Sequence, residues 1–246
     1  MSIKAVVLAA GKGSRIQTEG VDLPKVMRRA LDRPLLHYVL DAINFIPPQD
    51  TILVVGYQKE KVIEYFPNYV FAEQVEQLGT GHAVMAAEAA LGPGAFPVLI
   101  CYGDMPLLRR ETYEALVQRH LDEQNACTIL TGTTALPLPF GRIVRDKAGH
   151  FQEVVEDRDC TPEQKAIDEL NVGVYVFQSA ALLPALGALD NTTNAQNEYY
   201  LTDIPAILKS QGLPIGICKR NLGMEIIGVN TVEQLAEVEA ELKVRG

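Results

Sequence analysis

Glycines and basic residues follow the first apolar run of the chain, residues 5–8. Gly11 and Gly13 stand in the string LAAGKGSR, which includes Arg15, and an LPK tripeptide ends on Lys25. Glycines allow a backbone to approach a ligand closely and to turn several N–H groups in one direction, which creates a cradle for anions. Arginine adds a planar fork that suits phosphate, and lysine adds a compact positive charge. These residues predict a polyphosphate site at the carboxyl end of a buried strand.

The spacing of the glycines distinguishes this site from two common phosphate-binding motifs. The sequence contains no GxxxxGK(S/T) string and therefore no Walker loop. The third residue after Gly13 is Ile16 rather than glycine, so the string is not a dinucleotide fingerprint either. A glycine-rich turn alone is weak evidence, and the nearby Arg15 and LPK tripeptide strengthen the phosphate interpretation.

A carboxylate and an amide follow two further predicted strands. Asp104 comes shortly after the apolar run 96–102, and Asn230 follows the run 225–229. Mg²⁺ prefers oxygen ligands and is usually held by one or two protein groups together with phosphates and water. The two side chains are therefore candidate magnesium ligands. Two structural alternatives stay open: Asp104 can cap the next turn, and Asn230 can cap the last helix.

The string QLGTGHAV, residues 77–84, joins a predicted strand to a predicted helix. Its glycines are compatible with a simple turn into the helix, or with a backbone that a flat base can approach. Gln74, just upstream, offers an amide that can pair with an imide edge such as that of uracil. We interpret His82 as a packing or helix-start residue rather than as a catalytic base.

The periodicity of the first half alternates between strand and helix. We expect strands at 5–8, 51–55, 69–73, 96–102 and 127–131. We expect helices at 34–46, 59–65 and 110–123, and a further helix that follows the string 74–84 and continues through Leu91. This β–α–β alternation predicts an α/β protein with a mainly parallel sheet and helices on both faces. In such sheets ligands bind at the carboxyl ends of the strands, where the glycine string and Asp104 are both expected.

The second half has a different pattern. We expect a hairpin of 142–145 with 151–155, strands at 170–177, 215–219 and 225–229, and helices at 180–189 and 202–210. Thr161 and Gln164 form a capping-box pattern for a short helix. The expected organisation is one nucleotidyltransferase domain over 1–229, with a nucleotide-binding half at about 1–132 and a sugar-binding portion at about 133–229, followed by a C-terminal helix over 230–246.

Composition narrows the class of protein and its compartment. The 246 residues suffice for one large domain, and a formal net charge of -9 argues against a nucleic-acid surface, which needs a basic stripe. The four cysteines lack metal-ligand spacing, and Cys101 and Cys127 lie in apolar runs that indicate buried thiols. No apolar run reaches membrane-spanning length, and the first residues lead directly into a strand. We expect a cytoplasmic protein without membrane or nucleic-acid partners.

Nine strings occur in an order that resembles the uridyltransferase domain of bacterial N-acetylglucosamine-1-phosphate uridyltransferases. They cover essentially the whole chain: LAAGKGSR, LPK, QLGTGHAV, YGDMPLL, FGRIVRD, VVEDRD, NVGVYVF, NAQNEYYLTD and GVN. The resemblance implies a Rossmann-like nucleotide-diphosphosugar transferase fold. It also implies a Mg²⁺-dependent reaction in which UTP and N-acetylglucosamine 1-phosphate give UDP-N-acetylglucosamine and pyrophosphate.

The resemblance also implies a role for each matching residue. The implied nucleotide-binding residues are Leu8, Ala10, Gly11, Gly13, Gln74, Gly79 and Thr80. The implied catalytic cations, which hold the phosphates, are Arg15 and Lys25, and the implied metal ligands are Asp104 and Asn230. The implied sugar-binding residues are Gly141, Glu156, Asn171, Tyr199 and Thr202.

Three features depart from the family pattern. Residues 26–30 are more basic than the usual apolar run, and Val172 replaces a small hydroxyl residue next to Asn171. The sequence ends at Gly246 and contains no hexapeptide repeats, whereas bifunctional members continue into an acetyltransferase β-helix. We therefore expect neither acetyl transfer nor a β-helix trimer from this chain. The oligomeric state stays open.

The charges imply a direct displacement. A phosphate oxygen of the sugar phosphate would attack the α-phosphorus of UTP in line, with no covalent enzyme intermediate and no general base. Two alternatives stay open: a pyrophosphorylase for another sugar 1-phosphate, such as glucose 1-phosphate, or for another NTP, and a non-catalytic nucleotide-sugar-binding protein. A metal-dependent glycosyltransferase is disfavoured, because the sequence around Asp104 lacks paired aspartates.

Overall fold

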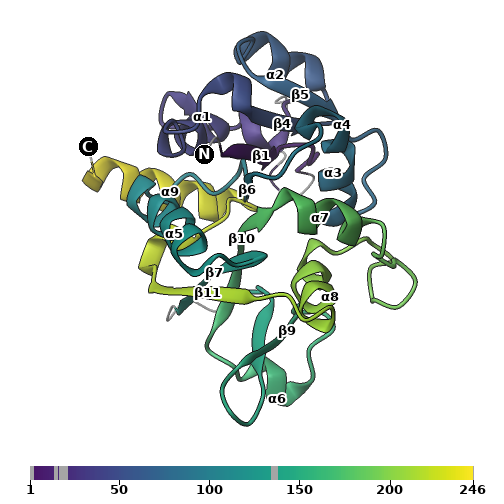
Figure 1. Ribbon diagram of the computed structural model, residues 1–246. Coiled ribbons are helices and arrows are strands. Elements are labelled where there is room, and N and C mark those ends of the chain that lie inside the picture. The colour runs from purple at the N-terminus through teal and green to yellow at the C-terminus, as the bar shows by residue number, and fades with distance from the viewer. Residues whose placement is uncertain (1–2, 14–15, 17–21, 134–137, 246) are drawn as a thin grey trace.

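A mixed sheet runs through the molecule, which is described by a computed structural model over residues 3–13, 16, 22–133 and 138–245 (Figure 1). Within these residues the sheet has nine strands, and seven form its main path in the order β11-β7-β10-β6-β1-β4-β5. The bounds of these seven are β1 Lys4–Leu8, β4 Thr51–Val55, β5 Val70–Glu73, β6 Pro97–Tyr102, β7 Cys127–Thr133, β10 Leu170–Gln178 and β11 Ile215–Asn221.

Most neighbouring strands of this path are parallel. β1 pairs in parallel with β4 and β6, β4 with β5, and β11 with β7, whereas β10 is antiparallel to both β6 and β7. The expected α/β class with a mainly parallel, mixed sheet is confirmed. β10 is the strand that joins the parallel group around β1 to the parallel pair β7–β11.

Helices cover both faces of the sheet, which is why the central strands are apolar on both sides. Along β1, Ala5 and Val7 pack with α1 Leu35–Ala42, α2 Lys59–Tyr65 and α5 Arg110–Glu123. Val6 and Leu8 point to the opposite face and pack with four other helices: α3 Thr80–Ala86, α4 Glu88–Leu91, α7 Ser179–Leu186 and α8 Ile204–Ser210. The alternation follows from the two-residue repeat of a strand.

The remaining elements extend this layered core. β8 Arg142–Arg145 and β9 Phe151–Val155 form the expected hairpin, and α6 Pro162–Lys165 begins with the expected capping box of Thr161 and Gln164. β9 and α6 lie at the end of the molecule opposite to α2 (Figure 1). The shorter elements are η2 Lys25–Met27, β2 Arg29–Ala30, β3 Arg33–Pro34, η3 Pro48–Asp50, η4 Leu201–Asp203 and η5 Gly223–Ile226, and the chain ends with α9 Val232–Arg245.

The strand expected at 225–229 is wrong. The chain forms η5 instead, with local hydrogen bonds from Glu225 N to Leu222 O at 2.8 Å and from Ile227 N to Met224 O at 3.2 Å. A short apolar run does not distinguish strand from helix by periodicity. Here Glu225 and Ile226 belong to η5, and Val229 N donates to the carbonyl of Asp104 at 2.9 Å rather than to a neighbouring strand. The helix expected at 34–46 is also shorter, because α1 ends at Ala42.

The cysteines agree with a further expectation. Cys101 and Cys127 are buried free thiols, as predicted. Across the described residues, none of the helices is both long enough and apolar enough to span a bilayer.

Strand register brings the site segments together. Leu8 of β1 lies opposite Tyr102 of β6 and opposite Val54 of β4, and Glu73 of β5 lies opposite Val55. Because these strands are parallel, the segments that follow β1, β5 and β6 leave the sheet at the same edge. This edge therefore carries Gly11, Gln74 and Asp104.

Candidate nucleotide and phosphate site

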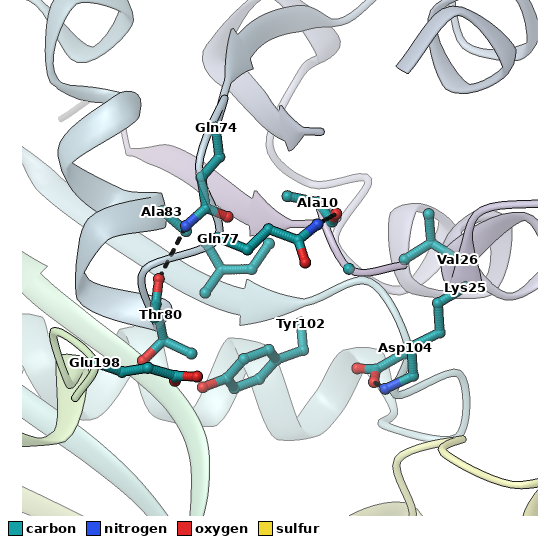
Figure 2. A pocket seen from close by; sticks show the side chains of 13 residues that line it. Ala10, Lys25, Val26, Gln74, Gln77, Thr80, Ala83, Tyr102, Asp104 and Glu198 are labelled. Carbon is teal, nitrogen blue, oxygen red and sulfur yellow. Dashed lines mark hydrogen bonds and ion pairs between the residues drawn. The ribbon is translucent and has the colours of Figure 1, made fainter. Parts of the chain in front are cut away.

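A cavity of about 440 Å³ opens at this edge of the sheet (Figure 2). The residues that line it come from the ends of β1 and β6, from η2, from the loop between β5 and α3, and from the segment before η4. They are Leu8, Ala10, Gly11, Lys25, Val26, Gln74, Gln77, Gly79, Thr80, Ala83, Tyr102, Asp104 and Glu198. Six of the seven predicted nucleotide-binding residues are in this set.

Lys25 lies between the two predicted metal ligands. Its Nζ forms an ion pair with the carboxylate of Asp104 and donates a hydrogen bond of 2.7 Å to Oδ1 of Asn230. Figure 2 shows the Lys25 and Asp104 side chains meeting at one end of the cavity. A single ammonium therefore holds together two oxygens from segments far apart in the sequence.

The base of the Lys25 side chain packs closely against Gly13. Gly13 has a φ of +68°, and a Cβ there would lie 2.8 Å from Cβ of Lys25. A side chain at Gly13 would thus carry both backbone strain and a steric clash. Gly13 is not among the residues that line the cavity, and it packs against Lys25, which is one of them. Arg15, the second predicted catalytic cation, lies outside the described residues.

Asn230 is free of the helix-capping role that stayed open in the sequence. Thr231 takes that role: its Oγ1 accepts from Gln234 N at 3.3 Å, and Gln234 Oε1 accepts from Thr231 N at 3.1 Å. Asn230 is brought to the site by its neighbour Val229, whose N–H donates to the carbonyl of Asp104 at 2.9 Å. The amide of Asn230 can therefore face Lys25.

Gln74 directly follows β5, and its side chain is held by the loop it precedes. Its Nε2 donates to the carbonyl of Gly79 at 3.0 Å and lies 3.2 Å from Nδ1 of His82. Its backbone N–H donates to Val55 O at 2.8 Å and so continues the pairing of β5 with β4. Gln74 is 5% exposed and lines the cavity, so an amide oxygen is available to a ligand at a defined position.

Gln77 is a cavity residue that sequence reasoning missed. Its Nε2 donates to the carbonyl of Ala10 at 2.7 Å and thereby ties the loop after β5 to the segment after β1 (Figure 2). It is the first residue of QLGTGHAV, so the motif contained a signal. The direction of the Gln77 side chain depends on how the loop after β5 and the segment after β1 run past each other, and the hydrophobic periodicity of the sequence does not report this.

The glycines of QLGTGHAV are required by another segment of the protein. Gly79 has a φ of +108°, and a Cβ there would lie 2.6 Å from the carbonyl oxygen of Tyr199. Gly81 N donates to this same oxygen at 2.7 Å, and Thr80 Oγ1 accepts from Leu201 N at 3.1 Å. The glycines therefore allow the chain around Tyr199 to pack closely against this loop. This packing brings the neighbouring Glu198 to the cavity.

Tyr102 and Glu198 also line the cavity and were not predicted. Gly173 has a φ of +79°, and a Cβ there would lie 2.3 Å from Cε2 of Tyr102, so the tyrosine ring occupies the space that this glycine leaves. Burial raises the pKa of both Tyr102 and Glu198 above their ordinary values.

The predicted sugar-binding residues form two pairs. Thr202 Oγ1 donates to Glu156 Oε1 at 3.0 Å, and Asn171 N donates to the carbonyl of Gly141 at 2.8 Å. Burial raises the pKa of Glu156, although the bond from Thr202 opposes this shift. The fifth residue, Tyr199, stacks on His82 with ring centroids 6.2 Å apart. These five are not among the residues that line the 440 Å³ cavity.

Asn171 already has internal partners. Its Oδ1 accepts from the hydroxyl of Tyr175 at 3.0 Å and from Gly173 N at 3.2 Å. Only its amide nitrogen remains for a ligand among the contacts of the described residues. This arrangement orients the amide as a hydrogen-bond donor.

The fold and the cavity define a class of protein. Residues 5–199 match the MobA-like NTP transferase domain, and the chain belongs to this family. A crystal structure of UDP-glucose pyrophosphorylase complexed with UDP-glucose superimposes with a TM-score of 0.74 at 18% identity, covering all of both chains. This likeness shows that the fold is shared. The predicted nucleotidyltransferase class is confirmed.

The sequence relatives are more specific. The chain is 42% identical to the bifunctional protein GlmU of Alkaliphilus oremlandii over 246 residues, which are 100% of this chain and 53% of the relative. It is 43% identical to GlmU of Clostridium beijerinckii over 243 residues, 98% of this chain and 52% of the relative. The chain spans about half the length of these curated relatives. The resemblance predicted from the nine sequence strings is confirmed.

Proposed function

We propose that the protein transfers UMP from UTP to N-acetyl-α-D-glucosamine 1-phosphate, with Mg²⁺, and releases pyrophosphate. The observation that carries this proposal is the cluster of Lys25, Asp104 and Asn230 at the end of a cavity with a glycine-containing wall. The membership in an NTP transferase family and the similarity to GlmU proteins support sugar-phosphate nucleotidyl transfer as the broader class.

The base would lie against Gln74, Gly79 and Thr80. The nitrogen of the Gln74 amide is already bonded to Gly79 O, so the amide oxygen is the group left for a ligand. An acceptor suits the N3–H of uracil. The triphosphate would then extend along the segment of Gly11 towards Lys25, and Arg15 would add a second cation.

The residues around Lys25 fit a divalent cation. Asp104 and Asn230 supply a carboxylate and a carbonyl oxygen, and both already surround one positive charge. The described residues contain no cluster of three or more acidic, histidine or cysteine ligands, which agrees with an ion held by few protein groups plus phosphate oxygens. When bound, Mg²⁺ would neutralise phosphate charge in the transition state.

The chemistry would be a single displacement. A phosphate oxygen of the sugar phosphate forms a new bond to the α-phosphorus of UTP while the bond to the bridging oxygen of pyrophosphate breaks. The attacking oxygen is already ionised near neutral pH, so no general base is needed. Lys25 and Arg15 would stabilise the charge that develops on the transferred group, and the cavity walls would align the reactants.

The sugar would lie beyond Tyr102, against the Glu156–Thr202 and Gly141–Asn171 pairs. The half-buried Glu156 carboxylate would accept from sugar hydroxyls, and the amide nitrogen of Asn171 would donate to the N-acetyl oxygen. The departure at Val172 does not alter these groups, because its side chain is 2% exposed and belongs to the core. A cytoplasmic location stays a prediction, supported by the free cysteines.

A panel of substrates tests the proposal. Pyrophosphate release is measured with UTP, CTP, ATP or GTP, each paired with N-acetylglucosamine 1-phosphate or glucose 1-phosphate, with and without Mg²⁺. The expected result is metal-dependent release with the highest kcat/KM for UTP and the N-acetylated sugar. A clear preference for glucose 1-phosphate would overturn the sugar assignment. Nucleotide-sugar binding without any release would indicate a sensor instead.

A further inference from the structure

We propose that His82 is a positioning residue for base selection. It holds the Gln74 amide so that only the acceptor oxygen faces the cavity, which favours a base with an N–H donor over a base with a bare ring nitrogen. This inference rests on the proposed function, in which the cavity binds a pyrimidine nucleotide next to Gln74.

The orientation of the Gln74 amide follows from its two neighbours. The backbone carbonyl of Gly79, 3.0 Å from Nε2, can only accept, so the NH₂ group must face it. The same NH₂ group lies 3.2 Å from Nδ1 of His82 and uses its second proton there. Nδ1 must therefore be the unprotonated ring nitrogen, and the ring proton is carried by Nε2.

The imidazole ring is itself held in place. It stacks on the ring of Tyr199, with an interplanar angle of 27°. The Tyr199 backbone is fixed at both sides, because its N–H donates to Leu78 O at 2.8 Å and its carbonyl accepts from Gly81 N at 2.7 Å. Hydrogen bonds therefore connect the loop after Gln74 to the chain around Tyr199, whose ring packs on His82.

A reversed amide would be unfavourable in this setting. A rotation by half a turn would place the Gln74 oxygen against two acceptors, the Gly79 carbonyl and His82 Nδ1. Two hydrogen bonds would be lost and two like dipoles would be brought together. In Figure 2 the amide nitrogen of Gln74 takes part in the dashed hydrogen bond, and the amide oxygen points to the other side, where Gln77 lies.

This fixed acceptor distinguishes the two pyrimidines. Uracil carries N3–H, which donates to the Gln74 oxygen, whereas N3 of cytosine is a lone pair that faces the same oxygen unfavourably. If the second support of the amide is removed, the amide can turn and serve cytosine with its NH₂ group. Removal of the His82 acceptor should therefore relax selection rather than abolish binding.

The test compares a variant without an acceptor at position 82 and a variant that restores one. H82F keeps an aromatic ring against Tyr199 but has no acceptor, and H82N has an amide oxygen at the position of Nδ1, two bonds from Cβ. The measured quantity is the ratio of kcat/KM for UTP to that for CTP at saturating N-acetylglucosamine 1-phosphate. Binding of UDP and CDP by calorimetry supplies the same ratio without turnover.

The expected result is a ratio that falls about tenfold in H82F, the scale of one lost and one opposed hydrogen bond, and that returns to within about threefold of the native value in H82N. An unchanged ratio in H82F, or an equal loss in both variants, would overturn the inference. A native protein that does not prefer UTP would instead contradict the proposed function.

A measurement on the native protein covers the case in which H82F does not fold. A long-range ¹H–¹⁵N spectrum distinguishes the two nitrogens of His82. An unprotonated Nδ1 with the proton on Nε2 supports the assignment. A proton on Nδ1 would overturn it, because Nδ1 could then not accept from Gln74.

Discussion

The ammonium of Lys25 and the carboxylate of Asp104 form an ion pair across 79 residues of sequence. The pair joins the segment after β1 to the segment after β6, and Asn230 Oδ1 completes it at 2.7 Å from the same Nζ. These are the two oxygens that the proposed function assigns to a divalent cation, so under that proposal the ammonium and the cation compete for them. Transfer of the ammonium to a phosphate oxygen would leave both oxygens to the metal.

Replacement of Lys25 should be costly for turnover. We expect K25M to lower kcat by about 10²–10³, the scale measured for loss of one transition-state donor. K59M is a matched control, because Lys59 also pairs with a carboxylate, Glu73, but on the exposed surface. Its rate should stay within about twofold of native. A similar loss in both variants would contradict a specific role of Lys25.

Removal of the lysine should also change metal binding in the absence of nucleotide. We expect K25M to bind Mn²⁺ more tightly than the native protein, because the ammonium no longer competes for Asp104 and Asn230. Electron paramagnetic resonance of free Mn²⁺ measures this affinity without turnover. Weaker binding in K25M would mean that the lysine does not compete for these oxygens.

Neutralisation of Asp104 should weaken the metal site itself. D104N should lower the Mn²⁺ affinity of the UTP complex at least about tenfold, because a charged oxygen ligand becomes neutral. D41N removes a carboxylate from an exposed pair with Arg33 and serves as the control. Equal affinities in D104N and D41N would place the metal elsewhere.

Alanine substitutions at two glycines with similar φ should distinguish the cost of backbone strain from the cost of a steric clash. Gly173 and Gly149 have φ values of +79° and +85°, but a Cβ at Gly173 would meet Tyr102 at 2.3 Å, whereas a Cβ at Gly149 would meet nothing within 4 Å. G149A should cost about 1 kcal/mol of unfolding free energy, the strain of a left-handed residue. G173A should cost about 1–3 kcal/mol more, because its neighbours must move.

Denaturant unfolding measures both variants. G173A should in addition raise the KM for substrate, because Tyr102 lines the cavity, whereas G149A should leave KM unchanged. Equal shifts of the unfolding midpoint in G173A and G149A would show that the Tyr102 ring moves aside without a loss of stability.

The buried His120 and the partly buried Asp203 should oppose each other in the pH dependence of stability. Burial lowers the pKa of His120 from 6.5 to about 4, so the unfolded state binds the proton more tightly and His120 makes stability rise with pH between about 4 and 6.5. Burial raises the pKa of Asp203 from 3.8 to about 6, so the folded state binds the proton more tightly and Asp203 makes stability fall with pH between about 3.8 and 6.

Single variants should separate these contributions. Across pH 4–6, H120L should make the slope of unfolding free energy against pH more negative than native, and D203N should make it more positive, each by up to about 1 kcal/mol per pH unit. Urea unfolding at several pH values measures the slopes. Changes of the same sign in both variants would contradict the assignment.

The sequence by itself determined the layered α/β core and most of the cavity wall. Apolar runs such as 5–8 and 96–102, bounded by glycines and alternating with helical periodicity, predict strands covered on both faces, and glycines next to basic residues predict an anion site. Leu8, Gly11 and Gln74, which the family resemblance assigns to the nucleotide, line the cavity. The run 225–229 was predicted wrongly, because its first two residues end the short helix η5 and the rest forms no strand pairing, with Val229 N donating to the carbonyl of Asp104 instead.

Only the tertiary structure decided which side chains meet. Strand register placed Asp104 beside the segment of Lys25, the cap at Thr231 left Asn230 free, and the chain around Tyr199 brought Glu198 to the cavity. Gln77, Tyr102 and Glu198 were missed because their directions depend on contacts between segments that are distant in sequence. Local periodicity reports which face of an element is buried, whereas a site is made from the ends of several elements whose spacing is set by packing.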